Sequence, residues 1–316
     1  MYKKNRVILI FPDPKMRGQK ADRPPLGILT VAAPLVEKYM DVCILDERVE
    51  PDFDARLSEE LKNVPVCVGI SSMSGRYITG ALRISWLIKQ QSSIPIVWGG
   101  VHPSLEPEST IRHELVDLIV LDDGEETFPK LVEALKDPSA DLRNIHGICF
   151  KKNGQVVMTA PAEPARIENL PFIPFNLVDL NKYSSREPWT SEKKLLPIET
   201  SRGCPFSCSF CTESTRKKKW RSLSPERVVR DIKEYVKQYG TSSFTFIDDN
   251  FFGDIKRGEK IVELLIKEKV GIEWYTNMPP DYMAGATPEF VMRLKESGCR
   301  MLTFGAESGS PRILKM

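Results

Sequence analysis

The sequence lacks the features that would assign it to a membrane-spanning, nucleic-acid-binding or disordered class. No apolar run approaches the roughly 20 residues that span a bilayer. Neither charge dominates, since 45 Lys and Arg face 43 Asp and Glu for a net charge of +2, so no overall field attracts nucleic acid or a membrane surface. A basic run at 216–221 is interpreted as a solvated turn with Trp220 packed as core. There is no internal repeat and no low-complexity tract.

The cysteines do not fit a disulfide framework. There are seven, an odd number, and three of them fall within eight residues. Disulfide-stabilised secreted domains instead carry an even number of spaced cysteines. We therefore expect a protein of the reducing cytoplasm.

The first part of the chain alternates between apolar runs and stretches with helical spacing. The runs are almost continuously apolar, as strands buried on both faces of a parallel sheet should be, and lie at 7–11, 42–46, 66–71, 94–100 and 118–122. This alternation predicts a doubly wound α/β domain. Ligands of such sheets bind outside the carboxyl ends of the strands, so we expect a site in the loops that follow these runs.

The middle of the chain breaks this rhythm. Two β-prone runs flank Asn153 and Gly154, which is the strongest short signal for a hairpin, and a proline-rich stretch follows. We predict a first domain over residues 1–140, a hairpin and proline-rich connector over 141–190, and a second α/β domain over 191–316.

The second domain has room for about four strand–helix units. Its predicted strands lie at 196–201, 244–249, 272–277 and 301–307, and helical stretches at 225–239, 257–269 and 288–297 separate them. Ser224 as a cap and Pro225 at the first helical position mark the start of the first of these helices. Four parallel strands with helices on one side do not close a barrel. The sequence therefore predicts a barrel that is incomplete at its C-terminal end.

Cys204, Cys208 and Cys211 directly follow the first of these strands. Structural zinc takes four ligands, and no fourth Cys or His lies nearby in the sequence, although zinc remains the main alternative. Three thiolates on one loop suit an iron–sulfur cluster in which one iron stays open, because such clusters are held by cysteine thiolates. An open iron can bind a substrate or a cofactor.

This CxxxCxxC spacing, with the aromatic Phe210 before the last cysteine, resembles the signature of radical S-adenosylmethionine (SAM) enzymes. The resemblance implies a 4Fe–4S cluster on the three cysteines, with an open iron that chelates SAM, and reductive cleavage of SAM to a 5′-deoxyadenosyl radical. It places Phe210 against the adenine. It also implies SAM contacts for four residues that end later strands: Asp249, Asn250, Glu307 and Ser308.

A sheet domain ahead of such a core resembles the cobalamin-binding branch of the superfamily, across essentially the whole chain. The resemblance implies a Rossmann-like cobalamin domain followed by a partial (β/α) barrel. It implies cobalamin contacts for residues of three loops: Ser71, Ser72, Met73, Gly99, Gly100, His102, Gly124 and Glu125. The run around Gly124 departs from the pattern of the branch at Asp122 and Asp123.

The loop after the first strand, residues 13–18, matches the cobalamin-domain pattern DxHxxG except that Lys15 replaces the histidine that ligates cobalt. A protonated ammonium has no lone pair to give. We therefore expect a lower cobalt face without histidine.

Together these features predict an anaerobic iron–sulfur enzyme that uses SAM and cobalamin on an unactivated carbon. Methyl transfer and oxidative ring cyclisation both fit. The resemblance implies a small-molecule or peptide substrate, recognised by later strands than this sequence contains, and a reductant such as ferredoxin or flavodoxin. A truncated inactive remnant and a noncatalytic iron–sulfur or cobalamin module are the alternatives.

Overall fold

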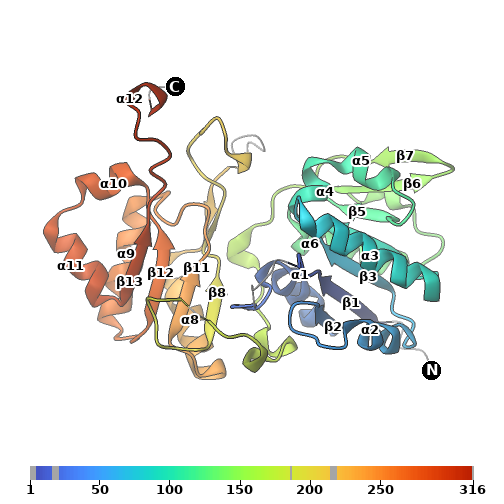
Figure 1. The fold of residues 1–316 in the computed structure, drawn as a ribbon, viewed down its shortest axis with the longest axis horizontal. Helices are drawn as coiled ribbons and strands as arrows, with labels where there is room; N and C mark the ends of the chain where they lie inside the picture. Colours follow the sequence, from blue (N-terminus) through green and yellow to red (C-terminus); the bar gives the residue numbers. More distant parts are fainter. Residues whose placement is uncertain (1–4, 16–20, 186, 214–218, 315–316) are drawn as a thin grey trace. The chain divides into compact units, whose positions relative to one another are not determined.

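The computed structural model describes residues 5–15, 21–185, 187–213 and 219–314, and the chain divides into two compact units (Figure 1). Unit 1 comprises Met1–Ala165 and Leu170–Tyr183, and unit 2 comprises Arg166–Asn169 and Ser184–Met316. Each unit is an α/β structure built on its own sheet, which confirms the predicted fold class.

Unit 1 is built on a sheet whose strand order, within the described residues, is β2-β1-β3-β4-β5-β6-β7. The first five strands are parallel, and β6 and β7 extend the sheet as an antiparallel hairpin beside β5. The strands are β1 (Arg6–Phe11), β2 (Asp41–Asp46), β3 (Cys67–Ser71), β4 (Ile96–Gly99), β5 (Leu118–Val120), β6 (Ile148–Lys152) and β7 (Gln155–Met158).

The turn between β6 and β7 is formed by Asn153 and Gly154, as predicted, with φ angles of 52° and 78°. Two positive φ angles suit the right-handed twist of the flanking strands. The hairpin belongs to the sheet of unit 1. The segment predicted as a connector, residues 141–190, is thus divided between the two units in the structure.

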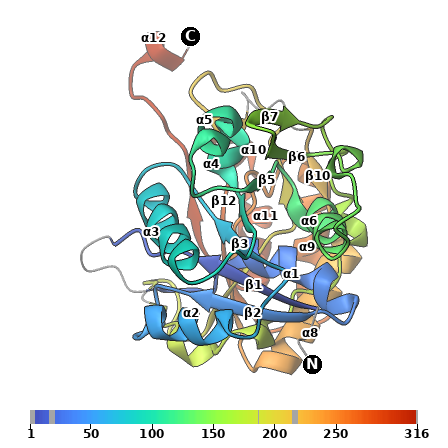
Figure 2. The ribbon, with the colours of Figure 1, turned by 90° about the vertical axis from the view of Figure 1, so that its right-hand side faces the viewer.

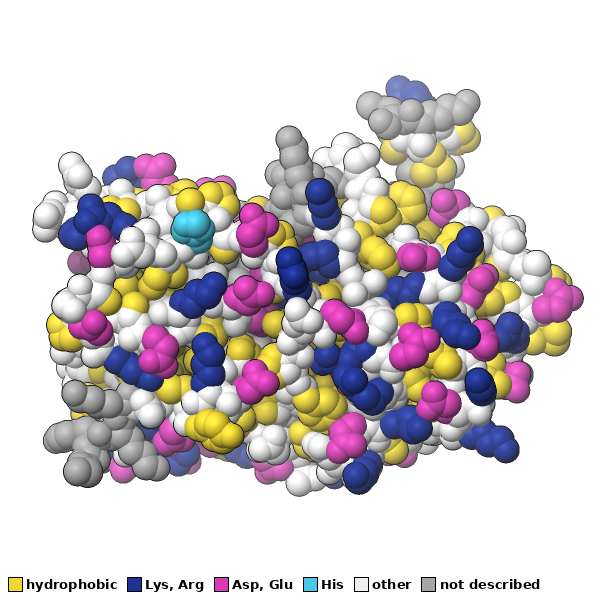
Figure 3. Space-filling model, turned by 180° about the vertical axis from the view of Figure 1, so that it is seen from behind, with side chains coloured by type: hydrophobic (Ala, Val, Ile, Leu, Met, Phe, Trp, Pro, Cys, Tyr) yellow, Lys and Arg dark blue, Asp and Glu magenta, His cyan; other side chains and the backbone are white. Residues whose placement is uncertain are grey.

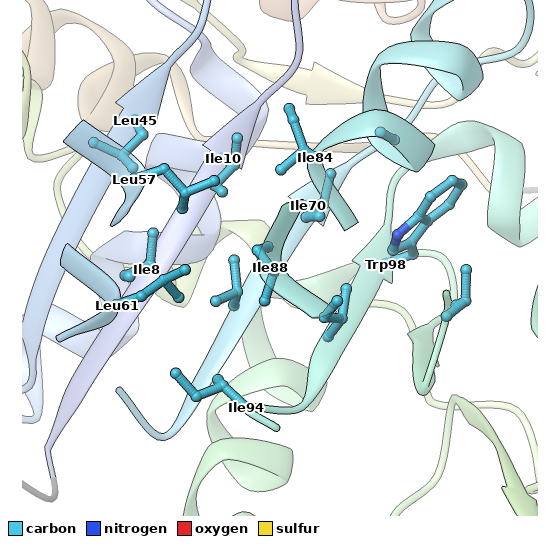
Figure 4. Packing of buried hydrophobic residues seen from close by; sticks show 14 of the residues in the cluster. Ile8, Ile10, Leu45, Leu57, Leu61, Ile70, Ile84, Ile88, Ile94 and Trp98 are labelled. Carbon is cyan, nitrogen blue, oxygen red and sulfur yellow. The ribbon is translucent and has the colours of Figure 1, made fainter. Parts of the chain in front are cut away.

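Helices cover both faces of this sheet (Figure 2). They are α1 (Leu26–Glu37), α2 (Phe53–Leu61), α3 (Arg76–Gln91), α4 (Val101–Leu105), α5 (Pro107–Arg112) and α6 (Gly124–Leu135). Along β1, Ile8 and Ile10 pack with α2 and α3, as Figure 4 shows, whereas Val7 and Leu9 pack with α1 and α6. Because successive side chains of a strand point to opposite faces, the continuous apolar run of β1 buries residues in two cores.

Unit 2 contains a parallel sheet whose order, within the described residues, is β13-β12-β11-β8. Its strands are β8 (Leu195–Ile198), β11 (Ser243–Phe246), β12 (Glu273–Asn277) and β13 (Cys299–Thr303). A short antiparallel ribbon pairs β9 (Ser201–Arg202) with β10 (Arg221–Ser222). The helices are α8 (Pro225–Tyr239), α9 (Ile255–Lys267), α10 (Pro280–Gly285), α11 (Pro288–Glu296) and α12 (Pro311–Leu314).

Helix α8 shows how local sequence signals fix an element of unit 2. The Ser224 hydroxyl accepts a hydrogen bond from the backbone N–H of Arg227, and Pro225 occupies the first turn. At the other end Gly240 adopts φ 61°, the left-handed conformation that commonly ends a helix. The helix therefore spans the residues predicted for it.

Among the described residues, no helix combines the length and the apolar character that crossing a bilayer requires. Basic and acidic side chains are interspersed on the face shown in Figure 3. This pattern agrees with the net charge of +2.

Candidate functional site

The three clustered cysteines share one loop that follows β8 and β9. Cys204 and Cys211 are half-buried, Cys208 is exposed, and no described cysteine forms a disulfide. The backbone N–H of Cys211 donates to the carbonyl of Cys208 at 3.1 Å. Among the described residues, no group of three or more His, Cys, Asp and Glu side chains is arranged so that it could hold a metal ion. The donor set of three thiols nevertheless fits a cluster with one open iron better than a four-ligand zinc site.

Asp248 supports the chain that leads into this loop. Its side chain is buried, with 1% of the residue exposed. It accepts hydrogen bonds from the backbone N–H and the hydroxyl of Thr200, both at 2.5 Å, and from the Ser201 hydroxyl at 3.1 Å. Burial raises the pKa of Asp248, and the hydrogen bonds from Thr200 and the charge of Arg257 oppose that rise.

Arg257 of α9 holds the same backbone from another direction. Its guanidinium donates to the carbonyl oxygens of Thr200 at 2.8 Å and Leu223 at 2.7 Å. Burial lowers the pKa of Arg257, while the negative charge of Asp248 acts to raise it. Thr200 is therefore fixed through its N–H, its hydroxyl and its carbonyl, four residues before Cys204.

Asp249 and Asn250 lie directly beside the cysteine loop. The Asp249 carboxylate accepts a hydrogen bond from the backbone N–H of Gly203 at 2.8 Å, one residue before Cys204. Asn250 is buried, and its Nδ2 lies 3.6 Å from Cys204 Sγ. Its Oδ1 is buried without a hydrogen-bond partner among the described residues. The structure thus brings together two of the predicted SAM contacts and the first cysteine, and their role in binding SAM stays a prediction.

The other predicted SAM contacts lie elsewhere on unit 2. Phe210 is 67% exposed. Glu307 and Ser308 follow β13, which forms the opposite edge of the sheet from β8, with β11 and β12 between them. Glu307 adopts φ 57°, and the Ser308 hydroxyl accepts from the N–H of Ser310 at 3.1 Å. Their assignment to SAM also stays a prediction.

In unit 1 the loops after β3 and β4 are bonded to each other. The N–H of Ser72 donates to the carbonyl of Gly99 at 2.8 Å, and the N–H of His102 donates to the carbonyl of Ser72 at 3.1 Å. Gly100 has φ 99°, and a Cβ there would lie 2.8 Å from the Ser72 carbonyl oxygen. The close approach of the two loops therefore requires glycine at this position, whereas a Cβ at Gly99 would meet nothing nearer than 3.9 Å.

Two side chains of these loops are accessible. Met73 is 45% exposed. The ring Nδ1 of His102 lies 3.3 Å from the Ser74 hydroxyl. Ser71, the last residue of β3, is half-buried. These positions at the carboxyl edge of a parallel sheet agree with the location expected for a ligand.

The loop after β5 leads into α6. Asp122 adopts φ 58°, and its N–H donates to the Ser104 hydroxyl at 2.8 Å. Gly124 begins the helix, where a Cβ would lie 3.1 Å from the Val31 side chain. Glu125 is buried, with 3% exposed, so this carboxylate lies within the protein and not on an open surface.

In the loop after β1, Lys15 contacts two carboxylates. Its ammonium lies 3.6 Å from a carboxylate oxygen of Glu47, and its N–H donates to the Asp13 carboxylate at 2.8 Å. Glu47 also accepts from the N–H of Asp13 at 2.8 Å. The ammonium therefore faces a carboxylate, in agreement with a lysine that is not a metal ligand. Residues 16–18 of the predicted motif lie outside the described residues.

The basic run at 216–221 is described only in part, because residues 216–218 lie outside the described residues. Trp220 is half-buried, and its indole N–H donates to the Asn250 carbonyl at 3.2 Å. The role of Arg257 and Trp220 in supporting the cysteine loop was not predicted. A basic side chain on an amphipathic helix and an aromatic in a basic turn carry no local signal of such a role.

Comparison with known proteins assigns both units. Residues 198–316 match the model of the radical SAM superfamily, and residues 19–132 match the B12 binding domain. An uncharacterised methyltransferase of Pyrococcus horikoshii is 30% identical over 98% of this chain and 67% of its own length. The chain belongs to the radical SAM superfamily. It carries a B12 binding domain ahead of the radical SAM region.

Other relatives of this radical SAM chain differ in activity. It is 27% identical to the anaerobic magnesium-protoporphyrin IX monomethyl ester cyclase of Synechocystis, over 84% of this chain and 54% of the cyclase. Among solved structures, the cobalamin-dependent SAM radical enzyme OxsB with aqua-cobalamin bound has a TM-score of 0.80 and 25% identity, covering 99% of this chain and 45% of OxsB. The chain therefore spans about half to two thirds of the length of these proteins.

Proposed function

We propose that the chain binds a 4Fe–4S cluster and SAM through unit 2 and cobalamin through unit 1, as part of a radical enzyme that transfers a methyl group to an unactivated carbon. The observation that carries this proposal is the cysteine loop with Asp249 and Asn250 beside Cys204, in the same chain as a B12 binding domain. The relative from Pyrococcus horikoshii, named as a methyltransferase, supports methyl transfer.

When bound, the cluster supplies one electron for the cleavage of SAM, and cobalamin supplies methyl-transfer chemistry. Cys204, Cys208 and Cys211 hold the cluster as thiolates. Oδ1 of Asn250 is a buried acceptor beside the cysteine ligands and has no hydrogen-bond partner among the described residues. It suits a cationic amino group, because buried acceptors without a partner are costly. Asp249 fixes the backbone that carries Cys204.

In unit 1, the linked loops after β3 and β4 offer cobalamin a surface that includes Met73 and His102. The Lys15–Glu47 pair supports a lower cobalt face without a histidine ligand, because a charged ammonium held by a carboxylate has no lone pair to donate. Gly124 and Glu125 complete the proposed contacts at the start of α6.

Oxidative ring cyclisation is a second candidate activity. It is favoured by the relative from Synechocystis, which is named as a cyclase and aligns with 84% of this chain. For either activity we propose a small-molecule substrate, with a peptide as the second class, and a one-electron protein reductant. We also propose that the enzyme works in a reducing, oxygen-free cytoplasm. Low-potential iron–sulfur clusters with an open iron need both conditions.

The proposal is tested by anaerobic reconstitution of the chain with iron, sulfide and hydroxocobalamin. We expect about four irons per chain, a bound corrin whose spectrum lacks nitrogen coordination at the lower face, and binding of labelled SAM that needs the cluster. The matched control is C299A, which removes a cysteine outside the loop.

Four results test the proposal and separate the candidates. Transfer of a labelled methyl group from SAM into product supports the methyltransferase, and ring closure without label transfer supports the cyclase. Loss of SAM binding in the triple variant C204A/C208A/C211A, with full binding in C299A, supports the cluster site. A chain that binds iron, SAM and cobalamin without producing 5′-deoxyadenosine under reduction would instead be a noncatalytic module.

A further inference from the structure

The side-chain amide of Asn250 is directed at a cysteine sulfur. Nδ2 lies 3.6 Å from Cys204 Sγ, a separation at which an N–H can donate to the large sulfur atom. Asn250 is 4% exposed. Water therefore competes little for this amide, and a hydrogen bond is electrostatically stronger in such a low-dielectric setting.

The backbone of Asn250 is held in place by two donors. Its carbonyl oxygen accepts from the Trp220 indole N–H at 3.2 Å and the Gly253 N–H at 3.1 Å. A Cβ at Gly253 would lie 2.5 Å from Trp220 Nε1, so the glycine is what allows the indole to approach. The amide of Asn250 is thus preorganised.

The backbone next to Cys204 is also fixed by a hydrogen bond. The preceding N–H, that of Gly203, donates to Asp249 at 2.8 Å, and Asp249 is the chain neighbour of Asn250. Donor and acceptor are therefore carried by two segments that the Gly203–Asp249 and Thr200–Asp248 hydrogen bonds join. Such a geometry persists without the entropic cost of ordering two mobile side chains.

The chemistry of the pair decides which amide atom faces the sulfur. A ligating cysteine is a thiolate, which has no hydrogen to donate, whereas the amide of asparagine offers two N–H donors and one acceptor oxygen. Only the NH₂ end can stabilise the thiolate. The opposite end, Oδ1, is then the buried acceptor that lacks a partner among the described residues.

We propose that Asn250 donates an N–H···S hydrogen bond to Cys204 and thereby raises the reduction potential of the cluster. The inference rests on the proposed cluster site and adds a tuning residue to it. Hydrogen bonds to the sulfurs are one of the factors that set cluster potentials. One-electron reduction adds negative charge that spreads over the sulfurs, so a donor stabilises the reduced form more than the oxidised form.

The test compares N250A and N250D with the wild-type chain, each reconstituted and titrated spectroelectrochemically without SAM, so that changes in SAM binding do not contribute. N250A removes the donor, and N250D replaces it with a carboxylate. We expect a lower midpoint potential in both, with the larger shift in N250D. The matched control N277D places the same charge at the carboxyl end of β12 and should shift the potential less than N250D.

An unchanged potential in N250A together with equal shifts in N250D and N277D would overturn the inference. Iron retention in the wild type tests the proposed function separately, so the two failures are distinguishable.

If the variants lose iron, the hydrogen bond is tested in the wild-type chain instead. Electron–nuclear double resonance is recorded on the reduced cluster, with asparagine labelled by ¹⁵N at Nδ2. A coupling from that nitrogen supports the hydrogen bond, and the absence of coupling overturns it.

Discussion

Replacing Asp248 by alanine tests the support beneath the cysteine loop. The variant removes the acceptor of three hydrogen bonds, from the Thr200 N–H, the Thr200 hydroxyl and the Ser201 hydroxyl. A buried backbone N–H left without a partner costs about 1–3 kcal/mol.

Because the buried Thr200 N–H loses its acceptor, we expect D248A to lower the free energy of unfolding of unit 2 by about 1–3 kcal/mol. With a urea m-value of about 2 kcal/mol/M, the midpoint falls by about 0.5–1.5 M. The matched control D248N keeps one acceptor oxygen for the Thr200 N–H and should lose about 1 kcal/mol or less.

The assay is hydrogen exchange at increasing urea, which reads the two units separately. Exchange in peptides from β8 and β11 should accelerate in D248A, while peptides from β1 and β3 of unit 1 serve as an internal control. If the β8 and β11 peptides of D248A exchanged at the wild-type rate, Asp248 would not support this backbone.

Three further predictions concern the same two regions. Burial raises the pKa of the Asp248 carboxyl group above 3.8. The stability of the wild type relative to D248N should therefore be highest below pH 3.8 and fall as the pH rises through the raised pKa. Urea titrations across this range would contradict this if the stability difference between the two proteins did not change with pH. G253A should displace the Trp220 indole, since its Cβ would lie 2.5 Å from Nε1, and shift tryptophan emission to longer wavelength; unchanged emission would show that the indole has room. G100A should weaken cobalamin binding at least about tenfold, because backbone strain of order 1–3 kcal/mol is added beside Ser72, and a spectral titration with wild-type affinity would refute this.

The fold could be predicted because its strands carry a strong local signal. Residues 7–11 of β1 are apolar at every position, as a strand covered on both faces requires, and the structure packs Ile8 and Val7 into different cores. The start of helix α8 could be predicted because Ser224 and Pro225 supply local cap chemistry. What joins the hairpin to unit 1 is its pairing with β5, a long-range contact that no local pattern specifies.

The residues of the candidate site could be named from the sequence, with Asp249 and Asn250 coming only from the family resemblance, but their contacts could not. The spacing of Cys204, Cys208 and Cys211 predicts three thiols on one loop. The contact of Asn250 with Cys204 joins residues 46 positions apart and depends on how β11 ends beside β8. Arg257 reaches Thr200 from a helix 57 positions later. Such contacts follow from tertiary packing, so they emerge only when the sheet is assembled.

The measurement that tests the central claim most directly is the iron and acid-labile sulfide content of the anaerobically reconstituted chain, compared with C204A/C208A/C211A and C299A. We predict about four irons and four sulfides in the wild type and in C299A, and essentially none in the triple variant. Equal iron in the triple variant and the wild type would contradict the assignment of the cluster to these three cysteines.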